Sequence, residues 1–445
     1  MLMTEDIVRI ARTPLTTWWP LGLNSVIEDP AGWQQEEYAW NHTVSLWAIE
    51  GPQGYSRVSG PDATRLMSDT CINNFSKARA NTIKQVIFCR DDGKIVYDTL
   101  CMVIEPGVYE LSMYPSRLQW ACDKYGSYDV QIEEVPSRTM IQVAGPRSFE
   151  LLSELTDCDL GAIRYGHFVS GVTFAGVEDV ILARFGMTNE LGFEIQADFS
   201  HLEEIVQRIV EVGEKYGMRK IGVRDHMVQH AEAGQLSIYY GDGLDATYDE
   251  GDDYAAYLAG DRFAVMAAKA VPKIRGSYEP KDWSDFYLSP VDVGLTKRID
   301  FSKDFIGKAA LENEVANPTR KFVTLEWNKE DVIDVYASMF ADGPAHERLD
   351  TPHYDYMEIP RDARLPIEAS RVLIDGKDVA FTTSRTYLYS FRKMVSNCLM
   401  PLAYTEPGTE VTIIWGEPGH LQKEIRATVQ THPYKPFNAK SLPTD

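Results

Sequence analysis

The sequence predicts an α+β protein of more than one domain, with helices on one face of antiparallel sheets and a small β-domain at the C-terminal end. Strand-like and helix-like segments alternate without a fixed period up to about residue 317, which favours an α+β body over a repeat array. From residue 318, short β-runs separated by turn residues replace the helical patterns. A chain of 445 residues is long enough for two or three packed domains. We therefore expect a body over 1–317 and a second domain over 318–445.

Composition limits the classes of partner. The formal net charge is −22, from 44 basic and 66 acidic side chains, and such a surface repels phosphate backbones and anionic membranes. We therefore expect no nucleic-acid or membrane partner. The N-terminal sequence lacks the features of a signal peptide, and no apolar run of about 18 residues occurs. Six cysteines without CxxC pairs or metal spacing predict buried free thiols and a reducing, cytoplasmic location.

The N-terminal half contains two strand–turn–helix units and a hairpin. Residues 55–70 predict a strand, a turn at 60–62 and a helix, and residues 139–156 repeat this order. The run at 91–93, Asp-Asp-Gly, predicts a hairpin turn between two segments rich in β-formers. Residues 108–115 then predict a strand, and residues 116–126 predict a helix that a glycine ends.

A clear helical periodicity follows over residues 201–217. From Leu202 to Val210, apolar residues recur with the 3.6-residue rhythm of an amphipathic helix. Gly213 falls on the same stripe and weakens the helix, and Gly217 ends it.

Two long segments lack a clear period. Residues 241–262 are acidic and aromatic, and they predict an irregular excursion of the kind that covers a site. Residues 337–366 predict a long surface insertion in the C-terminal domain. The β-runs of that domain fit a small barrel or a sandwich, and we expect the barrel. These runs are KFVTLEW, RVLIDGKDVAFTTSRTY, NCLMPLAYT, TEVTIIWGE and EIRATVQTH.

The segment Ala183–Gln196 carries the strongest functional signal. Gly186 and Gly192 delimit a loop between two strands, and Glu194 lies inside the second strand with an apolar residue on either side. Strand alternation places Glu194 on the face opposite those apolar neighbours. A lone glutamate at such a position can belong to a solvated strand face. Alternatively, its carboxylate can accept two parallel N–H bonds from a planar heterocycle such as a pterin.

The same segment, ARFGMTNELGFEI, resembles the signature of the aminomethyltransferase family, the T-proteins of the glycine cleavage system, which reads approximately TRTGYTGExGFEI. Met187 replaces the family's aromatic residue. The resemblance implies a folate-binding body of two intertwined α+β subdomains, with tetrahydrofolate as the cofactor. It also implies that Arg184 and Glu194 bind folate, Glu194 through the pterin. The matched positions are Arg184, Gly186, Thr188, Glu190, Gly192, Phe193, Glu194 and Ile195.

Two further segments extend the resemblance. Residues 90–103 resemble the family's hairpin GGIxDDLIV, with Tyr97 at the first acid and Asp98 at the second, which in the family sits beside the reacting nitrogens of folate. Without the resemblance, Asp98 reads equally well as an edge-strand or turn acid. Residues 220–244 resemble GxxARDxLRLEAGxxLYG with two extra residues, and they place Tyr240 on a tyrosine that lies along the folate. Including the match at 289–312, the resemblance covers residues from about 33 to about 432.

The family contains several chemistries, so the fold alone does not decide the reaction. The runs WQQEEYAWNHTVSL, TRLMSDTCIN, KFVTLEWNKEDVIDVYASMF and VTIIWGE have counterparts in folate-dependent aryl O-demethylases. The resemblance therefore implies transfer of a methyl group from an aromatic methyl ether to N5 of tetrahydrofolate. One alternative is demethylenation of a methylenedioxy-aromatic, which gives 5,10-methylenetetrahydrofolate and a catechol. The other is the aminomethyl transfer of glycine cleavage.

His226 and Asp98 are the catalytic candidates. His226 occupies the position of a tyrosine that acts at the ether oxygen in vanillate-demethylating enzymes, and a histidine there is a candidate general acid near neutral pH. The alternative is a packed histidine in the first helical turn beside Arg224 and Asp225. His230 lies four residues on and shares a helical face with His226. Because no third ligand is suitably spaced, we expect no metal.

The donor site differs from that of the vanillate-demethylating enzymes. Their histidine and arginine that meet the donor's carboxylate fall near Pro52 and Met113 here, and neither side chain can bind an anion. This difference predicts a small aromatic substrate that is less acidic or larger than vanillate. Trp19, Trp47 and Tyr114 are candidates to line an apolar aromatic site, although core packing explains tryptophans as often.

Two further classes compete with these enzymes. A folate-binding maturation factor of the same fold carries a KGCYxGQE-like motif, and its cysteine is absent from AGQLSIYYGDG. A domain of a flavin-linked dimethylglycine or sarcosine oxidase would need a GxGxxG after a strand, which is also absent. The sequence therefore favours a one-carbon transferase.

Overall fold

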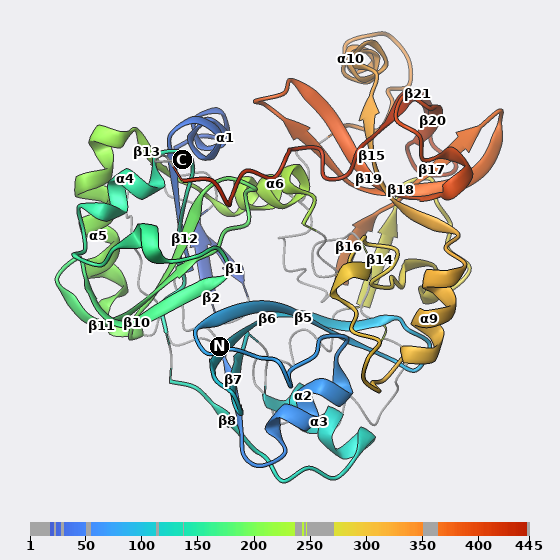
Figure 1. Cartoon of the computed structure of the whole chain (residues 1–445). Coiled ribbons are helices and arrows are strands. Elements are labelled where there is room, and N and C mark those ends of the chain that lie inside the picture. The colour runs from blue at the N-terminus through green and yellow to red at the C-terminus, as the bar shows by residue number, and fades with distance from the viewer. Residues whose placement is uncertain are drawn as a thin grey trace.

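The computed structural model describes residues 18–21, 24–27, 31–49, 55–112, 115–136, 138–235, 243, 246, 271–349 and 364–442. Figure 1 shows a body built on one long sheet, with a β-barrel beside it. The sheet has eleven strands in the order β13-β3-β9-β12-β11-β10-β5-β6-β7-β4-β8, and it divides into two half-sheets between β10 and β5. The α+β class and the C-terminal barrel predicted from the sequence are confirmed.

The first half-sheet runs from β13 to β10. Helices α4 (Ser148–Ser153) and α5 (Leu202–Gly213) cover one of its faces, and Leu46, Phe193 and Ile205 lie in the apolar core between them. Its strands are β3 (Val44–Ala48), β9 (Ile141–Ala144), β10 (His167–Phe174), β11 (Val177–Arg184), β12 (Gly192–Gln196) and β13 (Met218–Lys220). The opposite face of this half-sheet looks toward the interior of the molecule.

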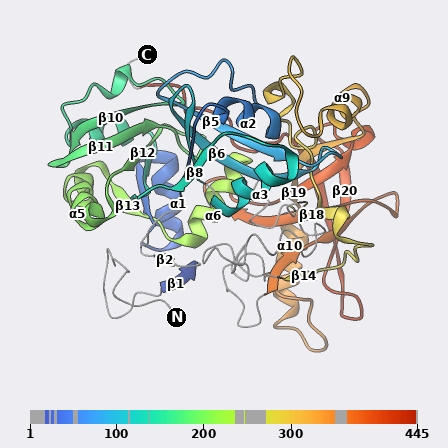
Figure 2. The same ribbon diagram turned by 90° about the horizontal axis from the view of Figure 1, so that it is seen from below.

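The second half-sheet runs from β5 to β8. Helices α2 (Ala63–Thr70) and α3 (Pro115–Tyr125) cover its outer face, where Leu66, Tyr109 and Leu118 form part of a second core. Figure 2 shows these two helices in front of the half-sheet when the molecule is seen from below. Its strands are β4 (Ser56–Ser59), β5 (Thr82–Cys89), β6 (Ile95–Glu105), β7 (Val108–Leu111) and β8 (Gln131–Glu134).

A narrow seam joins the two half-sheets. His167 of β10 pairs with Thr82 of β5, and the Ile83 N–H donates to the Gly166 carbonyl at 2.8 Å. Beside the seam, Met102 and Phe168 pack into a small buried cluster that also contains Ala183. The inner faces of both half-sheets therefore form one continuous surface.

The C-terminal part is a closed barrel in the order β15-β19-β18-β17-β20-β21. Its strands are β15 (Arg320–Trp327), β17 (Ser370–Ile374), β18 (Lys377–Leu388), β19 (Lys393–Pro401), β20 (Glu410–Trp415) and β21 (Lys423–Gln430). Helix α9 (Lys308–Ala316) leads into the barrel, and α10 (Lys329–Ser338) follows its first strand. Beside the barrel, β14 (Val271–Arg275) pairs in parallel with β16 (Arg364–Glu368).

Several local predictions are confirmed. The predicted strand and helix at 55–70 are β4 and α2, and the predicted hairpin is β5 and β6, paired antiparallel. Helix α5 ends at Gly213, continues as a 3-10 turn to Tyr216 and stops at Gly217, whose φ is 71°. A Cβ on Gly213 would lie 2.8 Å from the Met218 side chain, so packing requires glycine there.

The two aperiodic segments are described only in part. Apart from Gly243 and Ala246, the predicted excursion at 241–262 lies outside the described residues. The predicted insertion at 337–366 begins at the end of α10 and reaches into β16, and its residues 350–363 lie outside the described part.

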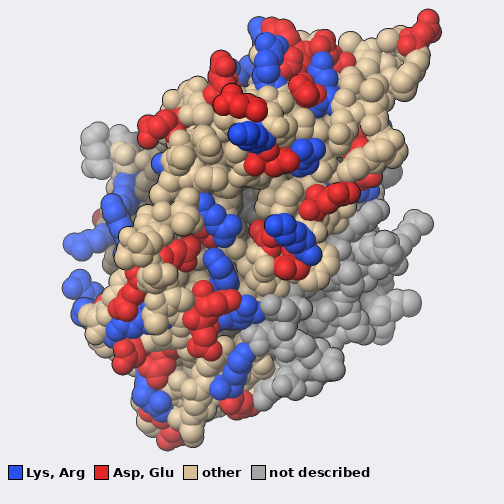
Figure 3. Space-filling model, turned by 90° about the vertical axis from the view of Figure 1, so that its right-hand side faces the viewer, with Lys and Arg blue, Asp and Glu red and all other residues tan. Residues whose placement is uncertain are grey.

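The sequence predicted buried free cysteines and no membrane or nucleic-acid partner, and the structure can be compared with each of these predictions. All six cysteines are free thiols, and all except Cys158 are buried, as the sequence predicted. Among the described helices, none has the length and apolar character needed to cross a membrane. On the face drawn in Figure 3, acidic and basic side chains are interleaved over the described surface. A continuous patch of basic side chains does not mark this face.

Candidate active site

A row of side chains crosses the inner face of the first half-sheet. Trp47 of β3 lies opposite Gln142 of β9, and Gln142 lies opposite Glu194 of β12. Glu194 in turn lies opposite Ala183 of β11. Directly opposed residues of a sheet share a face, so this row lies on the side away from α5.

Glu194 is a buried carboxylate with one hydrogen-bonded oxygen. Its side chain belongs to a residue that is only 4% exposed, so the solvated-face alternative is wrong. Gln196 Nε2 donates to Glu194 Oε1 at 2.5 Å, and within the described chain no group donates to Oε2. Burial raises the pKa of Glu194, and the hydrogen bond from Gln196 lowers it. A carboxylate on a buried residue that keeps one oxygen without a donor from the described residues is typical of a group that meets a ligand.

Two neighbours of Glu194 add polar groups that the sequence did not reveal. The Oε1 atom of Gln196 is buried and accepts no hydrogen bond from the described residues. Burial raises the pKa of the buried Tyr55, and the charge of Glu194 raises it further. Gln196 lies two residues beyond Glu194 on the same strand face, so alternation alone could have found it.

Asp98 lies on the same continuous face, on the second half-sheet. Alternation along β6 puts Asp98 on the side of Met102, four residues away. Met102 packs against Ala183, which is the residue opposite Glu194. Asp98 lies inside β6, so the alternative of a turn acid is wrong. Its strand pairs with β5 at this point, and the register with β7 begins only at Cys101, so the edge-strand alternative stays open.

The Asp98 carboxylate resembles that of Glu194 in its surroundings. Gln85 Nε2 donates to Asp98 Oδ2 at 2.8 Å, and no donor to Oδ1 occurs in the part of the chain that the structure describes. Burial raises the pKa of Asp98 to about 7, against the hydrogen bond from Gln85 and the charge of Arg298, which lower it. Asp98 is therefore close to half-ionised near pH 7 and can take up or release a proton there.

His226 lies in the first turn of α6 (Val223–Ala233) and stacks on Trp47. The ring centroids are 3.8 Å apart and the planes differ by 4°, while His230 meets His226 edge-on at 4.9 Å. The predicted shared face of the two histidines is thus confirmed. Burial lowers the pKa of His226 well below its usual range, and the charge of His230 lowers it further. The imidazole is therefore neutral near pH 7, and the role of His226 as a general acid stays a prediction.

Most of the signature loop, residues 185–191, has a structural task. A Cβ on Gly186 would lie 3.3 Å from the Gly192 Cα, so the two ends of the loop touch through their glycines. Asn189 adopts a φ of 57° and donates from Nδ2 to the Ala233 carbonyl at 2.9 Å. The loop thereby binds the end of α6, and Glu194 is the charged side chain that the signature segment contributes to the row.

Arg184 lies away from the other predicted folate-binding residues. It neighbours Ala183 on β11 and therefore points to the opposite face from Glu194. Its guanidinium donates to the Ile163 carbonyl at 3.1 Å and to the Lys440 carbonyl at 2.6 Å. These contacts hold main chain, and a folate-binding role for Arg184 stays a prediction.

Several predicted positions lie wholly or partly outside the described residues. Trp19 belongs to β1 (Trp18–Leu21), which pairs with β2 (Asn24–Ile27), and its side chain is not among the described ones. Tyr114 and Tyr240 lie outside the described residues, as do Pro52 and Met113. The structure thus brings Trp47 and His226 into contact and puts Glu194 and Asp98 on the same sheet face. In the described part of the chain, no cluster of three or more His, Cys, Asp or Glu side chains is arranged to hold a metal.

Comparison with known proteins identifies the family. The profile described as the GCVT N-terminal domain matches residues 27–251. A sesamin methylene transferase of Sinomonas sp. (strain No.22) is 32% identical over 383 residues, which cover 85% of this chain and 82% of that protein. The chain belongs to the glycine-cleavage T-protein family.

Other members of this family extend the comparison. A syringate O-demethylase of Sphingobium sp. (strain NBRC 103272 / SYK-6) is 26% identical over 427 residues, covering 91% of this chain and 88% of that protein. An aminomethyltransferase of Oceanobacillus iheyensis is 25% identical over 371 residues, covering 81% and 80%. The aminomethyltransferase T of the glycine cleavage system from Bartonella henselae has the same fold, with a TM-score of 0.66 at 14% identity over 96% of each chain.

These relatives decide the class of activity. They are named as a methylene transferase, an O-demethylase and an aminomethyltransferase. This family member is therefore an enzyme, a one-carbon transferase related to the aryl O-demethylases, and not the non-enzymatic maturation factor. The family as a whole is folate-dependent. Which one-carbon donor this enzyme uses depends on the residues of its own active site.

Proposed function

We propose that this enzyme transfers a one-carbon unit from an aromatic ether to tetrahydrofolate. The observation that carries the proposal is the pair of carboxylates on one sheet face, Glu194 and Asp98. In each, a glutamine holds one oxygen, and no described residue donates to the other. Glu194 Oε2 and Gln196 Oε1 together offer acceptors to the N–H groups along one edge of a pterin. Asp98 would then lie beside the folate nitrogens that receive the one-carbon unit.

The overall reaction needs proton movement but no oxidant. With a methyl ether, one O–C bond breaks, an N5–C bond forms, and the N5 proton ends on the phenolic oxygen. With a methylenedioxy ring, two O–C bonds break, bonds to N5 and N10 form, and two N–H protons end on the catechol oxygens. Bound tetrahydrofolate supplies the nucleophilic nitrogens, so the protein has to position both reactants and carry protons from nitrogen to oxygen.

Asp98 and His226 suit that proton transfer. A carboxyl with a pKa of about 7 can accept a proton from a folate nitrogen and release it near neutral pH. A neutral imidazole has one donor and one acceptor nitrogen, so His226 can receive a proton at one nitrogen while it gives one from the other. The flat stack on Trp47 fixes the plane of the ring during this exchange.

Of the two kinds of ether, we favour the methylenedioxy donor. The relative named as a sesamin methylene transferase shares 32% identity, against 26% for the syringate O-demethylase. The stack of Trp47 on a neutral His226 also favours an uncharged aromatic donor. O-demethylation of an aromatic methyl ether, the reaction that the sequence favoured, is the second candidate.

The product distinguishes these candidates. The enzyme is incubated with tetrahydrofolate and a panel of methylenedioxy- and methoxy-aromatics, and the folate products are followed by mass spectrometry. We expect 5,10-methylenetetrahydrofolate together with a catechol. Formation of 5-methyltetrahydrofolate from a methoxy-aromatic assigns O-demethylation instead. Inactivity on every aromatic, combined with turnover of an aminomethyl-lipoyl donor, contradicts the proposal.

A further inference from the structure

The chain returns from the barrel to the body after β21. Residues 431–442, here called the C-terminal strap, cross from the barrel to the region of α1 (Trp33–His42) and α6, as Figure 1 shows in dark red. The Asn438 N–H donates to the Asn189 carbonyl of the signature loop at 2.7 Å. A Cβ on Gly234, at the end of α6, would lie 2.4 Å from the Pro433 Cβ, so the strap packs directly on that end.

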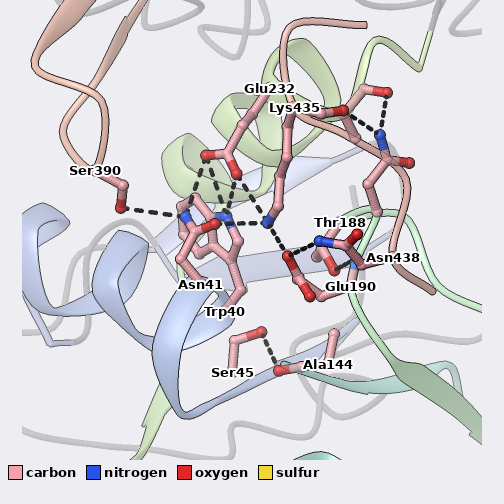
Figure 4. A network of polar contacts seen from close by, with 12 residues as sticks. Trp40, Asn41, Ser45, Ala144, Thr188, Glu190, Glu232, Ser390, Lys435 and Asn438 are labelled. Atoms are coloured by element: carbon pink, nitrogen blue, oxygen red, sulfur yellow. Dashed lines mark hydrogen bonds and ion pairs between the residues drawn. The ribbon is translucent and has the colours of Figure 1, made fainter. Parts of the chain in front are cut away.

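Lys435 is the central side chain of the strap. It is 3% exposed, and its Nζ lies 2.6 Å from Asn41 Oδ1, 3.0 Å from Glu232 Oε1 and 3.2 Å from Glu190 Oε1. Figure 4 shows the ammonium group between these partners. Asn41 belongs to α1, Glu232 to α6 and Glu190 to the signature loop. One buried cation therefore joins three separate elements of the body.

The charges around Lys435 make this junction sensitive to its loss. Glu232 is fully buried, and burial raises its pKa while the charge of Lys435 lowers it. Trp40 Nε1 and Asn41 Nδ2 also donate to the Glu232 carboxylate, at 3.4 and 3.3 Å. If Lys435 is removed, Glu190 and Glu232 face each other without a buried cation between them. An uncompensated buried charge is strongly unfavourable, so the two elements are expected to separate or repack.

Each joined element carries a residue of the candidate active site. Helix α6 carries His226 in its first turn and Glu232 in its last, and the signature loop leads directly into β12, which carries Glu194. We propose that Lys435 is a positioning residue for one-carbon transfer: through Glu232 and Glu190, it fixes the spacing between the helix that carries His226 and the strand that carries Glu194. The effect on catalysis rests on the proposed function. The structural coupling of α6 to β12 through Lys435 does not depend on that function.

The physical reason lies in the geometry of group transfer. Displacement at carbon requires the nucleophile, the carbon and the leaving oxygen in line, and small misplacements of supporting groups reduce the rate strongly. The folate contacts near Glu194 and the proton transfer at His226 must therefore keep a fixed distance and orientation relative to each other. Lys435 belongs to the C-terminal strap, which follows the last strand of the barrel. The geometry of the site therefore also depends on correct docking of the barrel against the body.

Substitution of Lys435 tests the proposal through turnover. Lys435→Met is compared with Lys423→Met, a control on β21 that removes an ion pair with Asp334 on the barrel. We expect kcat of Lys435→Met to fall roughly 10- to 100-fold while its KM for tetrahydrofolate changes less than about threefold. Lys435→Met/Glu232→Gln should recover part of the lost kcat, because one uncompensated carboxylate is removed. A purely structural lysine would lower the melting temperature and leave kcat of the folded enzyme unchanged, which would overturn the proposal.

Amide hydrogen exchange tests the coupling without any assay of activity. In Lys435→Met, exchange should accelerate together in α6 and in residues 185–191, and the double variant should restore part of the protection in both. Unchanged exchange in both elements overturns the proposal. An inactive wild-type enzyme would count against the proposed function alone, since the exchange result is independent of the donor. If Lys435→Met does not fold, Lys435→Arg keeps the charge with a bulkier head group, and the same two readouts apply to it.

Discussion

Glu194 is buried and Asp98 is half-buried, and the described residues donate to only one carboxylate oxygen of each. Each is held from one side by a glutamine, Gln85 or Gln196, at 2.8 or 2.5 Å. Partial satisfaction fixes the orientation of each group and leaves an acceptor for a ligand. The cost of that arrangement appears in the raised pKa of both carboxyl groups.

The raised pKa of Asp98 predicts opposite effects of one substitution on stability and activity. Between its ordinary pKa of 3.8 and about 7, folded Asp98 holds a proton that the unfolded chain releases, so its contribution to stability falls as pH rises through this window. Asp98→Asn is neutral at every pH and avoids that penalty. We expect the variant to be more stable than wild type by about 1 kcal/mol or more at pH 8, with little difference near pH 4, and to lose turnover.

Thermal unfolding at both pH values, together with the product assay, checks this expectation. Asp91→Asn, in the exposed turn of the same hairpin, serves as the control and should match wild type in both measurements. Lower stability of Asp98→Asn at pH 8 would show that the carboxylate is stabilised by partners, contrary to our account.

Residue-level prediction from sequence succeeded where strand alternation and the family signature agreed. Glu194 was placed correctly on the face opposite its apolar neighbours, because period-2 alternation is a local property. The glutamines were missed, since a lone glutamine in a strand has no distinctive pattern. Gln85 follows from the hairpin register: Ile87 opposes Asp98, which makes Gln85 its diagonal neighbour. Tyr55 has no local signal at all.

The position of His226 in helix α6 follows from the sequence, but its protonation state depends on how the helix packs. The sequence predicted that His226 lies in a first helical turn and shares a face with His230, and both features are present. It did not predict the protonation state, because that depends on burial against Trp47 of β3, a contact between residues far apart in the chain. Burial also lowers the pKa of His230 to about 4, so both rings are neutral near pH 7.

Replacement of His226 separates chemistry from binding. His226→Gln removes the ring that can accept and donate a proton together, and we expect turnover to fall about 10²- to 10⁴-fold while folate affinity stays within about threefold of wild type. Steady-state kinetics and folate titration measure the two quantities. His201→Gln, an exposed histidine at the start of α5, is the matched control and should behave as wild type. Turnover near the wild-type rate in His226→Gln removes His226 from the mechanism.

At the scale of the whole molecule, the site depends on pairings between distant segments. The row from Trp47 to Glu194 joins strands that lie far apart in the chain, and the seam at His167 and Thr82 continues that face to Asp98. The sequence predicted the α+β body and the barrel from local periodicity and turn residues. It did not predict that one sheet spans the body or that the C-terminal strap returns to the body. Contacts between segments far apart in the chain produce no periodic pattern in the sequence.

The central claim is that this inner face holds the folate, and Glu194 tests it most directly. Binding of a non-reacting folate, 5-formyltetrahydrofolate, is measured by calorimetry for wild type, Glu194→Gln and the control Glu178→Gln on the exposed side of β11. A charge-assisted hydrogen bond to the pterin predicts that Glu194→Gln binds at least about 10-fold more weakly, while Glu178→Gln binds as wild type does. Equal affinity of Glu194→Gln and wild type, or no binding by wild type, would contradict the account.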